Sequence, residues 1–170
     1  MTQVKSNIVL IGMPGSGKST VGIVLAKLCL RDFLDTDVLI QSREGMKLQD
    51  IIDSSGHSGL RKIEEQVILT LSAENYVIAT GGSAIYSDSA MGHLKQNGWI
   101  VFLDVSLEIL ESRLGDYSAR GIARCPGQTI IDLFEERGEL YRRYADYTIK
   151  CDHLSQDQVS KIVAKELEER

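Results

Sequence analysis

The chain has 170 residues, of which 43% are hydrophobic and only 2 are proline, so we expect one globular domain over residues 1–170 rather than a linker-rich array. Its apolar runs are no longer than a strand, and the N-terminus lacks a secretory hydrophobic region, which argues against a membrane span or an export signal. A net charge of −5 without any basic run argues against nucleic-acid binding.

The first predicted elements are a strand at 7–11, a glycine loop at 12–19 and a helix from about 20. The loop fits the phosphate-loop pattern G-x-x-x-x-G-K-[ST] at each fixed position: Gly12, Gly17, Lys18 and Ser19. Glycines let backbone N–H groups close around phosphate oxygens, while the lysine would neutralise the β- and γ-phosphates and the serine would bind Mg²⁺. The alternative, a turn with an incidental lysine, is disfavoured by the flanking strand and helix. The apolar face of that helix is predicted to hold Val21, Val24, Leu25 and Leu28.

Further strands are predicted at 33–34, 76–80, 99–103 and 147–149, separated by stretches long enough for crossover helices. This rhythm indicates a parallel α/β sandwich. Capping boxes at Thr129-x-x-Asp132 and Ser155-x-x-Gln158 predict the starts of two helices. The last helix should carry an apolar face of Val159, Ile162, Val163 and Leu167. Between 114 and 128 the periodicity fails and glycine and arginine accumulate, which indicates a mobile lid.

Chemically useful side chains follow the predicted strands, where open α/β sheets bind their ligands. The first such segment is the phosphate loop; the others are Asp35-Thr36-Asp37, residues 80–83 and, before the lid helix, Arg120 and Arg124. Two carboxylates at i and i+2 of an extended segment point the same way, so one could serve Mg²⁺ through water and the other could hold a hydroxyl. An Asx-type turn that ends the strand is the alternative.

Taken in order, these motifs resemble the shikimate kinase family over nearly the whole chain. Residues 12–22 match its phosphate loop, 33–37 match F-x-D-x-D, and 60–64 stand where the family has F-R-x-x-E. Residues 77–83 stand at its strand ending in three glycines, and 137–146 at R-x-P-L-Y…A-D. The resemblance implies a nucleotide-kinase-like, three-layer α/β/α fold with a five-stranded parallel sheet in the order 2-3-1-4-5. Within it, an acceptor-binding segment is implied at about 36–62 and a lid at about 114–128.

The resemblance also implies ATP-dependent phosphorylation of a hydroxyl on a small carboxylated ring, shikimate becoming shikimate 3-phosphate. Asp37 would hold and help deprotonate the acceptor hydroxyl, Arg61 and Arg137 would bind its carboxylate, and Gly81 and Gly82 would supply backbone amides. Arg113 would lie on the adenine side. Lys18, Mg²⁺ and the lid Arg120 would stabilise the transferring charge. The implied ATP ligands are Gly12, Gly15, Ser16, Gly17, Lys18, Ser19, Thr20, Arg113 and Arg120, and the implied metal ligands are Ser19 and Asp35.

Simpler interpretations stay open for the arginines. Arg61 could form a helix salt bridge with Glu64 or Glu65, and Arg137 could be a surface residue among neighbouring glutamates. Arg124 could replace Arg120 if the register of the lid shifts.

The sequence departs from the family pattern on the acceptor and lid side. Ser83 replaces the third glycine, Leu60 the phenylalanine before the arginine, and Glu139 the proline after Arg137, and the lid lacks R-P-L-L. Because such changes can alter discrimination by roughly 1 to 3 kcal/mol, two alternatives stand beside shikimate kinase. One is a kinase for another small hydroxy acid or polyol, gluconate-like or homoserine-like. The other is a nucleotide-gated binding module without useful turnover.

Cysteine usage bears on the compartment. Cys29, Cys125 and Cys151 are odd in number, widely spaced and without a C-x-x-C pair, which favours reduced thiols in a cytoplasmic protein over disulfides or zinc. We expect a monomer that takes a small anionic substrate.

Overall fold

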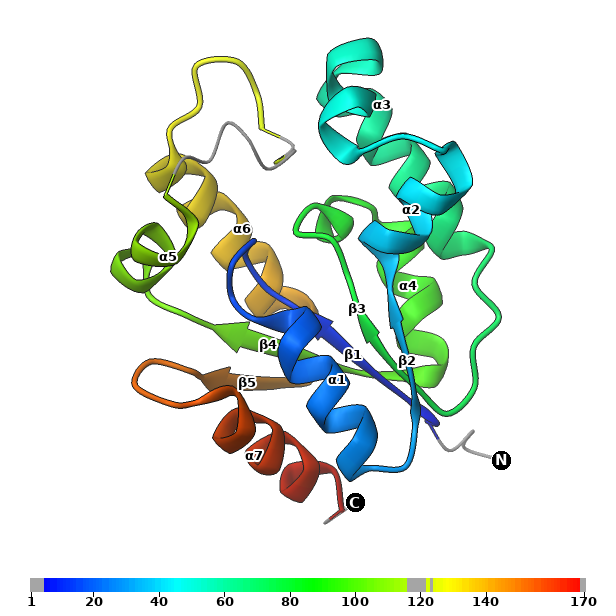
Figure 1. The fold of residues 1–170 in the computed structure, drawn as a ribbon, viewed down its shortest axis with the longest axis vertical. Helices are drawn as coiled ribbons and strands as arrows, with labels where there is room; N and C mark the ends of the chain where they lie inside the picture. Colours follow the sequence, from blue (N-terminus) through cyan, green and yellow to red (C-terminus); the bar gives the residue numbers. More distant parts are fainter. Residues whose placement is uncertain (1–4, 116–121, 123, 169–170) are drawn as a thin grey trace.

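A single parallel sheet organises the molecule (Figure 1). The structure, a computed structural model, describes residues 5–115, 122 and 124–168. Its strands run in the order β2-β3-β1-β4-β5, all parallel, as the resemblance implied. The strands are β1 (Asn7–Ile11), β2 (Asp32–Asp35), β3 (Tyr76–Ala79), β4 (Gly98–Asp104) and β5 (Tyr147–Lys150). Each lies within two residues of its predicted range, so the predicted fold class is confirmed.

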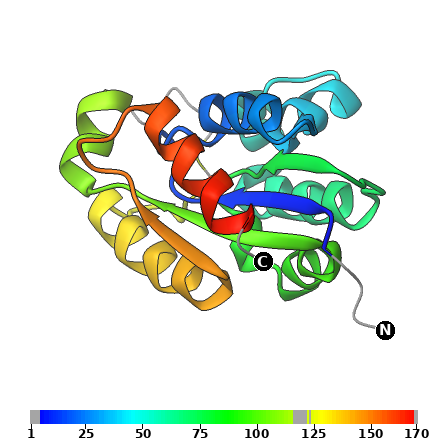
Figure 2. The same cartoon turned by 90° about the horizontal axis from the view of Figure 1, so that it is seen from below.

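Helices cover both faces of this sheet (Figure 2). On one face α1 (Lys18–Leu28) packs against α7 (Gln156–Glu168), and on the other lie α4 (Asp88–Asn97) and α6 (Ile130–Tyr144). The short helix η1 (Ala84–Tyr86) precedes α4, and α5 (Leu107–Leu114) follows β4. Two more helices, α2 (Thr36–Glu44) and α3 (Leu48–Leu69), extend beyond the carboxyl ends of the strands.

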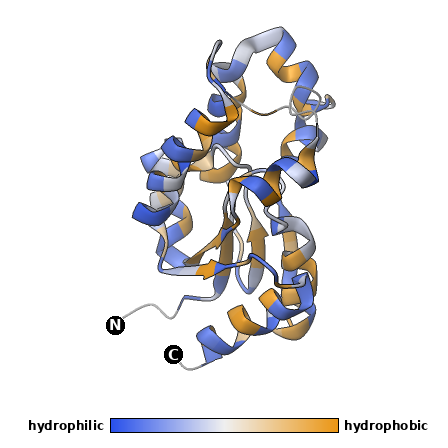
Figure 3. Ribbon diagram, turned by 90° about the vertical axis from the view of Figure 1, so that its left-hand side faces the viewer, coloured by the Kyte–Doolittle hydropathy of each residue, from blue (hydrophilic) through white to orange (hydrophobic). Residues whose placement is uncertain are grey.

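The main core lies between the sheet and its helices, and the strands of the sheet are coloured largely as hydrophobic in Figure 3. Every residue of β1 is buried, as expected for the central strand of a doubly covered parallel sheet. The predicted face of α1 is buried at Val21 and Leu25, but Leu28 at its end is 45% exposed. The predicted face of α7 is buried at Val159 and Val163, whereas Ile162 is 37% exposed. The apolar periodicity therefore located α1 and α7 correctly, but it predicted a wider buried face than either helix has.

A second, smaller apolar cluster joins α2 to α3. Its buried members are Ile40, Ile51, Ile52, Leu60 and Val67. This cluster contains no strand residue, so the predicted acceptor segment at 36–62 is held together largely by its own side chains. Gly56, with φ 72° and ψ 177°, kinks α3 within that segment, in a backbone region that favours glycine.

Local signals fix the helix starts. Thr129 and Asp132 form a reciprocal capping box at the start of α6. Before α7, the Ser155 N–H donates to Gln158 Oε1 and the Gln158 N–H donates to Ser155 Oγ. Both predicted capping boxes are therefore confirmed. All three cysteines carry free thiols. Within the described ranges, no helix is long and apolar enough to cross a membrane.

Candidate active site

The phosphate loop lies between the carboxyl end of β1 and the N-terminus of α1. Gly17 is the N-cap of α1 and adopts φ 93°, a left-handed conformation that favours glycine. A Cβ on Gly15 would lie 2.7 Å from Leu114 Cγ, so that glycine permits close packing of α5 over the loop. The loop therefore ends at the N-terminus of α1, where the positive end of the helix dipole favours phosphate binding.

Lys18 is held inside this loop. Its Nζ donates to the backbone oxygens of Gly12 at 2.8 Å and Met13 at 2.9 Å, and the residue is 9% exposed. Burial lowers the pKa of the ammonium group to about 8, with Asp37 acting in the opposite direction. The group therefore stays mainly protonated at neutral pH and can meet a phosphate as a cation.

Asp35 links the phosphate loop to α2. Its Oδ1 accepts from the backbone N–H groups of Asp37 at 2.9 Å and Val38 at 3.3 Å and so caps α2, while Ser19 Oγ donates to its Oδ2. The extended i, i+2 arrangement predicted for the two aspartates is wrong, because Asp37 lies in the first turn of α2. The Asx-type turn, kept as the alternative, is what forms.

The Ser19 hydroxyl and the Asp35 carboxylate suit Mg²⁺ as a donor set. Magnesium commonly takes one or two protein oxygens and fills its other positions with water and nucleotide phosphate. Among the described residues no cluster of three His, Cys, Asp or Glu side chains could hold a metal alone. The pair could therefore serve as a partial site of the kind that a nucleotide completes.

Asp37, in the first turn of α2, lies close to Gly81. Its Oδ1 would lie 2.7 Å from a Cβ on Gly81, and the Gly81 N–H donates to buried Thr36 Oγ1 at 3.0 Å. Burial, with a smaller contribution from the Asp35 charge, raises the pKa of the Asp37 carboxyl to about 6. A carboxylate with such a pKa is ionised at neutral pH and basic enough to accept a hydroxyl proton.

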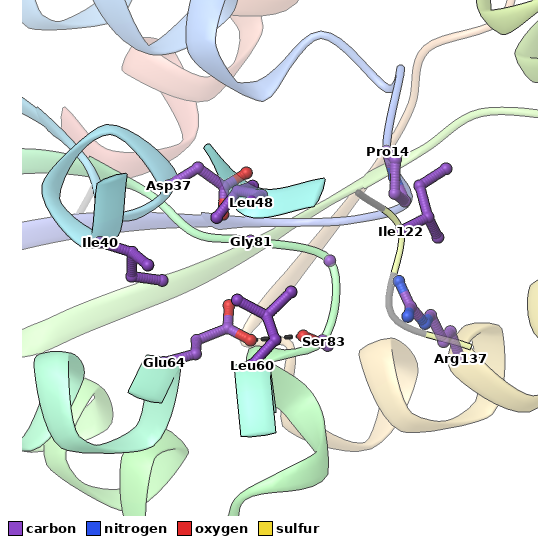
Figure 4. A pocket seen from close by; sticks show the side chains of 11 residues that line it. Pro14, Asp37, Ile40, Leu48, Leu60, Glu64, Gly81, Ser83, Ile122 and Arg137 are labelled. Carbon is purple, nitrogen blue, oxygen red and sulfur yellow. Dashed lines mark hydrogen bonds between the residues drawn. The ribbon is translucent and has the colours of Figure 1, made fainter. Parts of the chain in front are cut away.

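A pocket opens between Asp37 and α6 (Figure 4). Its empty volume is about 410 Å³. Its lining residues come from the phosphate loop, α2, α3, the turn after β3, the lid and α6: Pro14, Asp37, Ile40, Leu48, Leu60, Glu64, Gly81, Gly82, Ser83, Ile122 and Arg137. We call it the acceptor pocket.

Arg137 forms the cationic wall of the acceptor pocket. It is 1% exposed, its Nε donates to Tyr86 Oη at 3.4 Å, and a Cβ on Gly82 would lie 2.6 Å from its Nη1. The surface-residue interpretation of Arg137 is therefore wrong. Tyr141 Oη donates to the Gly82 oxygen at 2.7 Å, which fixes the turn that Arg137 contacts.

Arg61 is not among the described residues that line the acceptor pocket, and it lies over the ring of Tyr86 instead. Its guanidinium carbon is 3.8 Å from the centroid of the Tyr86 ring, while that of Arg137 is 5.5 Å from the same centroid. The salt bridges found within the described ranges do not include Arg61, so the predicted pair with Glu64 or Glu65 does not form. Tyr86 thus brings the two predicted carboxylate-binding arginines together.

Sequence reasoning assigned no role to Glu64 or Tyr86. Glu64 is 3% exposed, and its Oε2 accepts a hydrogen bond from Ser83 Oγ. Burial raises the pKa of its carboxyl to about 7, and the Ser83 hydrogen bond acts in the opposite direction. Glu64 closes the family motif at 60–64, so that motif carried a usable signal. Tyr86 carried none, because its role depends on contacts with two distant arginines.

Part of the predicted lid can be placed. Ile122 lines the acceptor pocket, and the Arg124 N–H donates to His57 Nδ1 at 3.2 Å, so this part of the lid contacts the acceptor segment. Arg113 Nη1 donates to the Gly15 oxygen at 3.1 Å, beside the phosphate loop. The predicted lid arginine, Arg120, lies outside the described residues.

The acceptor pocket adjoins a second, more open cleft over the phosphate loop. Its empty volume is about 800 Å³, and its lining includes Lys18, Ser19 and Thr20. Pro14 and Asp37 line both cavities. A group held by Lys18 and a group held by Asp37 would therefore meet where the two cavities join.

Comparison with known proteins adds independent information. A family model described as shikimate kinase matches residues 14–168. The chain is 38% identical to a shikimate kinase from a Sulfurihydrogenibium species over 165 residues, covering 96% of this chain and 99% of that protein.

Two solved structures share the fold closely. A shikimate kinase from Acinetobacter baumannii in complex with shikimate matches with a TM-score of 0.89 and 34% identity over 99% of this chain and 96% of that one. The enzyme from Aquifex aeolicus matches with a TM-score of 0.82 and 36% identity over 95% and 96%.

Proposed function

This chain belongs to the shikimate kinase family, and from that premise we propose that it transfers the γ-phosphoryl group of ATP to a hydroxyl of shikimate, giving shikimate 3-phosphate and ADP. One observation carries the proposal: Asp37 lines both the phosphate-loop cleft and the pocket that contains Arg137. A carboxylate at that junction can act on an acceptor hydroxyl while the donor phosphate lies against Lys18.

The donor side would be served by the phosphate loop. The implied ATP ligands are Gly12, Gly15, Ser16, Gly17, Lys18, Ser19, Thr20 and Arg113, with Arg120 from the lid. Phosphoryl transfer needs mainly positioning and cations against the equatorial oxygens, which Lys18 and a lid arginine provide. Ser19 and Asp35 would hold Mg²⁺, which would neutralise charge on the nucleotide phosphates.

The acceptor side would be served by residues around the acceptor pocket. Asp37 would orient the attacking hydroxyl and accept its proton. Arg137 would bind the acceptor carboxylate through its planar fork, with Arg61 reinforcing the positive potential behind Tyr86. Gly82 would supply a backbone amide to the acceptor, as the resemblance implies, whereas the Gly81 amide already donates to Thr36 Oγ1. A side chain at Gly81 would displace Asp37, and one at Gly82 would displace Arg137.

A different small hydroxy acid is the second candidate acceptor. Two of the departures from the family pattern, Leu60 and Ser83, line the acceptor pocket itself. Both change its shape or hydrogen bonding at the position where acceptors are discriminated.

The test is ADP release with shikimate, gluconate, homoserine and nucleoside monophosphates, with the product identified by ³¹P NMR. Lys18→Ala protein prepared in parallel controls for a contaminating kinase. We expect kcat/KM for shikimate to exceed that for every other acceptor by at least about 100-fold, the scale of a hydrogen-bonded recognition site. A higher kcat/KM for another acceptor would replace shikimate. ATP binding without any acceptor-dependent turnover would favour a nucleotide-gated binding module.

We also infer a monomer located in the cytoplasm. The three free cysteines support a reducing compartment. Sedimentation of the purified protein at micromolar concentration tests the first inference, and fractionation of the source cells tests the second.

A further inference from the structure

Ser83 and Glu64 form a buried hydrogen-bonded pair at the edge of the acceptor pocket (Figure 4). Ser83 Oγ donates to Glu64 Oε2, and the two residues are 7% and 3% exposed. Glu64 comes from α3 and Ser83 from the turn after β3, so the bond joins α3 to that turn.

The second oxygen of Glu64 lies beside Gly81, which lines the acceptor pocket. Among the described residues Oε1 is buried without a hydrogen-bond partner. It is also the atom nearest to where a Cβ on Gly81 would stand, and the next nearest is Asp37 Oδ1. Two carboxyl oxygens, from Asp37 and Glu64, therefore approach the same glycine. A buried acceptor atom without a partner costs about 1 to 3 kcal/mol unless a ligand satisfies it, so its position points to a ligand donor.

Arg61 could compete for Glu64, because the two residues are one helical turn apart on α3. Arg61 instead stacks on Tyr86, and its Nε is buried without a hydrogen-bond partner in the described part of the chain. The Ser83 hydroxyl, where the family pattern has a glycine, is the group that holds the Glu64 carboxyl toward the pocket.

We propose that Ser83 is a positioning residue that fixes Glu64 so that its free oxygen accepts a hydrogen bond from a hydroxyl of the acceptor other than the one phosphorylated. This inference rests on the proposed function, and it narrows the acceptor to a carboxylate with at least two hydroxyls, one at Asp37 and one at Glu64. Shikimate, with three ring hydroxyls, belongs to that class.

The ionisation of Glu64 supports this assignment. Burial raises the pKa of its carboxyl to about 7, and the hydrogen bond from Ser83 lowers it. The bond therefore helps to keep Glu64 ionised at neutral pH, and an ionised carboxylate accepts a stronger hydrogen bond from a hydroxyl. The other charged groups that act on Glu64 are Asp37, Arg137 and Lys18.

The kinetic test is Ser83→Ala. In the proposal, Glu64 contacts a hydroxyl that does not react. Loss of this contact in Ser83→Ala should therefore weaken binding of the ground state and of the transition state alike. We expect KM for shikimate to rise about 10-fold, the effect of one hydrogen bond to a charged group, with kcat and the KM for ATP within about twofold of the parent. The deoxy analogues of shikimate each lack one hydroxyl that does not react, and in the parent each should have a higher KM than shikimate. In Ser83→Ala, the analogue that lacks the hydroxyl bound by Glu64 should have the same KM as shikimate.

A matched control is available one residue along α3. Ser87 Oγ donates to Glu65 Oε2 in a similar pair, and neither residue lines the acceptor pocket. Ser87→Ala should leave the KM for shikimate unchanged, although it also removes the N-cap of α4 and should lower stability by the cost of a cap.

A readout independent of turnover is the ¹³C NMR titration of the Glu64 carboxyl, assigned with Glu64→Gln. We expect its pKa to rise in Ser83→Ala and to stay unchanged in Ser87→Ala. An unchanged pKa would overturn the coupling of Ser83 to Glu64. A raised pKa with an unchanged KM for shikimate and for both deoxy analogues would overturn the hydroxyl contact. Failure of the proposed function is distinguishable, since a protein without shikimate kinase activity would still show the shift in pKa.

Discussion

The Ser19 hydroxyl donates a hydrogen bond to Oδ2 of Asp35. Ser19 follows the phosphate-loop lysine in the chain, and Asp35 caps α2. The two oxygens of Asp35 thus have separate tasks, because Oδ1 accepts from the backbone of Asp37 and Val38. A change at Asp35 can therefore be designed to affect one task without the other.

Asp35→Asn should weaken Mg²⁺ binding and spare the fold. The amide oxygen can still cap α2, but the negative charge next to Ser19 is lost. We expect the Mg²⁺ concentration for half-maximal activity to rise about 10-fold, with the free energy of unfolding changed by less than about 1 kcal/mol. Asp35→Ala is the matched variant and should lose about 1 kcal/mol more stability, because it also removes the cap. An unchanged Mg²⁺ dependence in both variants would remove Asp35 from the metal site.

Gly81→Ala should disable the acceptor side. The added Cβ would lie 2.7 Å from Asp37 Oδ1 and closer still to Glu64 Oε1, so both carboxyl groups must move. We expect kcat/KM for the acceptor to fall at least about 100-fold, while the Kd for ATP measured by calorimetry changes little. Gly92→Ala in α4 is the control, since a Cβ there meets nothing within 4 Å. It should stabilise the protein by up to about 1 kcal/mol without changing kinetics. Equal kinetics for the two variants would show that Gly81 does not position the carboxyl groups.

Arg120→Ala and Arg124→Ala separate the two candidates for the lid arginine. Arg124 contacts His57 through its backbone N–H, which an alanine preserves, so its replacement should leave the lid contact in place. We expect Arg120→Ala to lower kcat by about 100-fold or more, the scale of one lost transition-state cation, and Arg124→Ala to lower it less than about fivefold. The opposite order, measured at saturating ATP and acceptor, would assign the role to Arg124.

Local patterns in the sequence were enough to predict the secondary structure around the phosphate loop. The phosphate loop needs only consecutive residues, and its strand, glycines and helix all formed where the pattern placed them. The same holds for the capping boxes at Thr129 and Ser155, whose partners are three residues away.

The acceptor half depends on residues that are distant in the chain. Glu64 and Ser83 are 19 residues apart, and the packing of α3 against η1 and α4 brings them together. The ring of Tyr86 lies near both Arg61 and Arg137, and Arg61 is not among the described residues that line the acceptor pocket. For the two aspartates the extended interpretation was wrong and the Asx-type alternative was right, because Asp35 caps α2 and so places Asp37 in the first turn of that helix.

Asp37→Asn should lower activity and raise the free energy of unfolding, and the gain in stability should depend on pH. The fold raises the pKa of this carboxyl from 3.8 to about 6, so between these values the folded state holds a proton that the unfolded chain has released. The contribution of Asp37 to the free energy of unfolding therefore falls as pH rises from about 4 to about 6 and stays low above that. Activity has the opposite sign, because only the ionised carboxylate accepts the hydroxyl proton, and kcat/KM for the acceptor should decline below about pH 6.

In Asp37→Asn we expect kcat to fall at least about 100-fold with ATP binding retained. We expect the free energy of unfolding from urea titrations to exceed that of the parent by about 1 to 3 kcal/mol at pH 8. At pH 4.5 the gain should be small, because most of the proton-linked difference has not yet developed there. The fold also raises the pKa of Glu64, to about 7. The Asp37→Asn variant should therefore keep some pH dependence of stability, and this should be lost only when Asp37→Asn is combined with Glu64→Gln. A variant that is less stable than the parent at both pH values would show that the Asp37 carboxylate stabilises the fold, and the buried, destabilising charge assigned to it would be wrong.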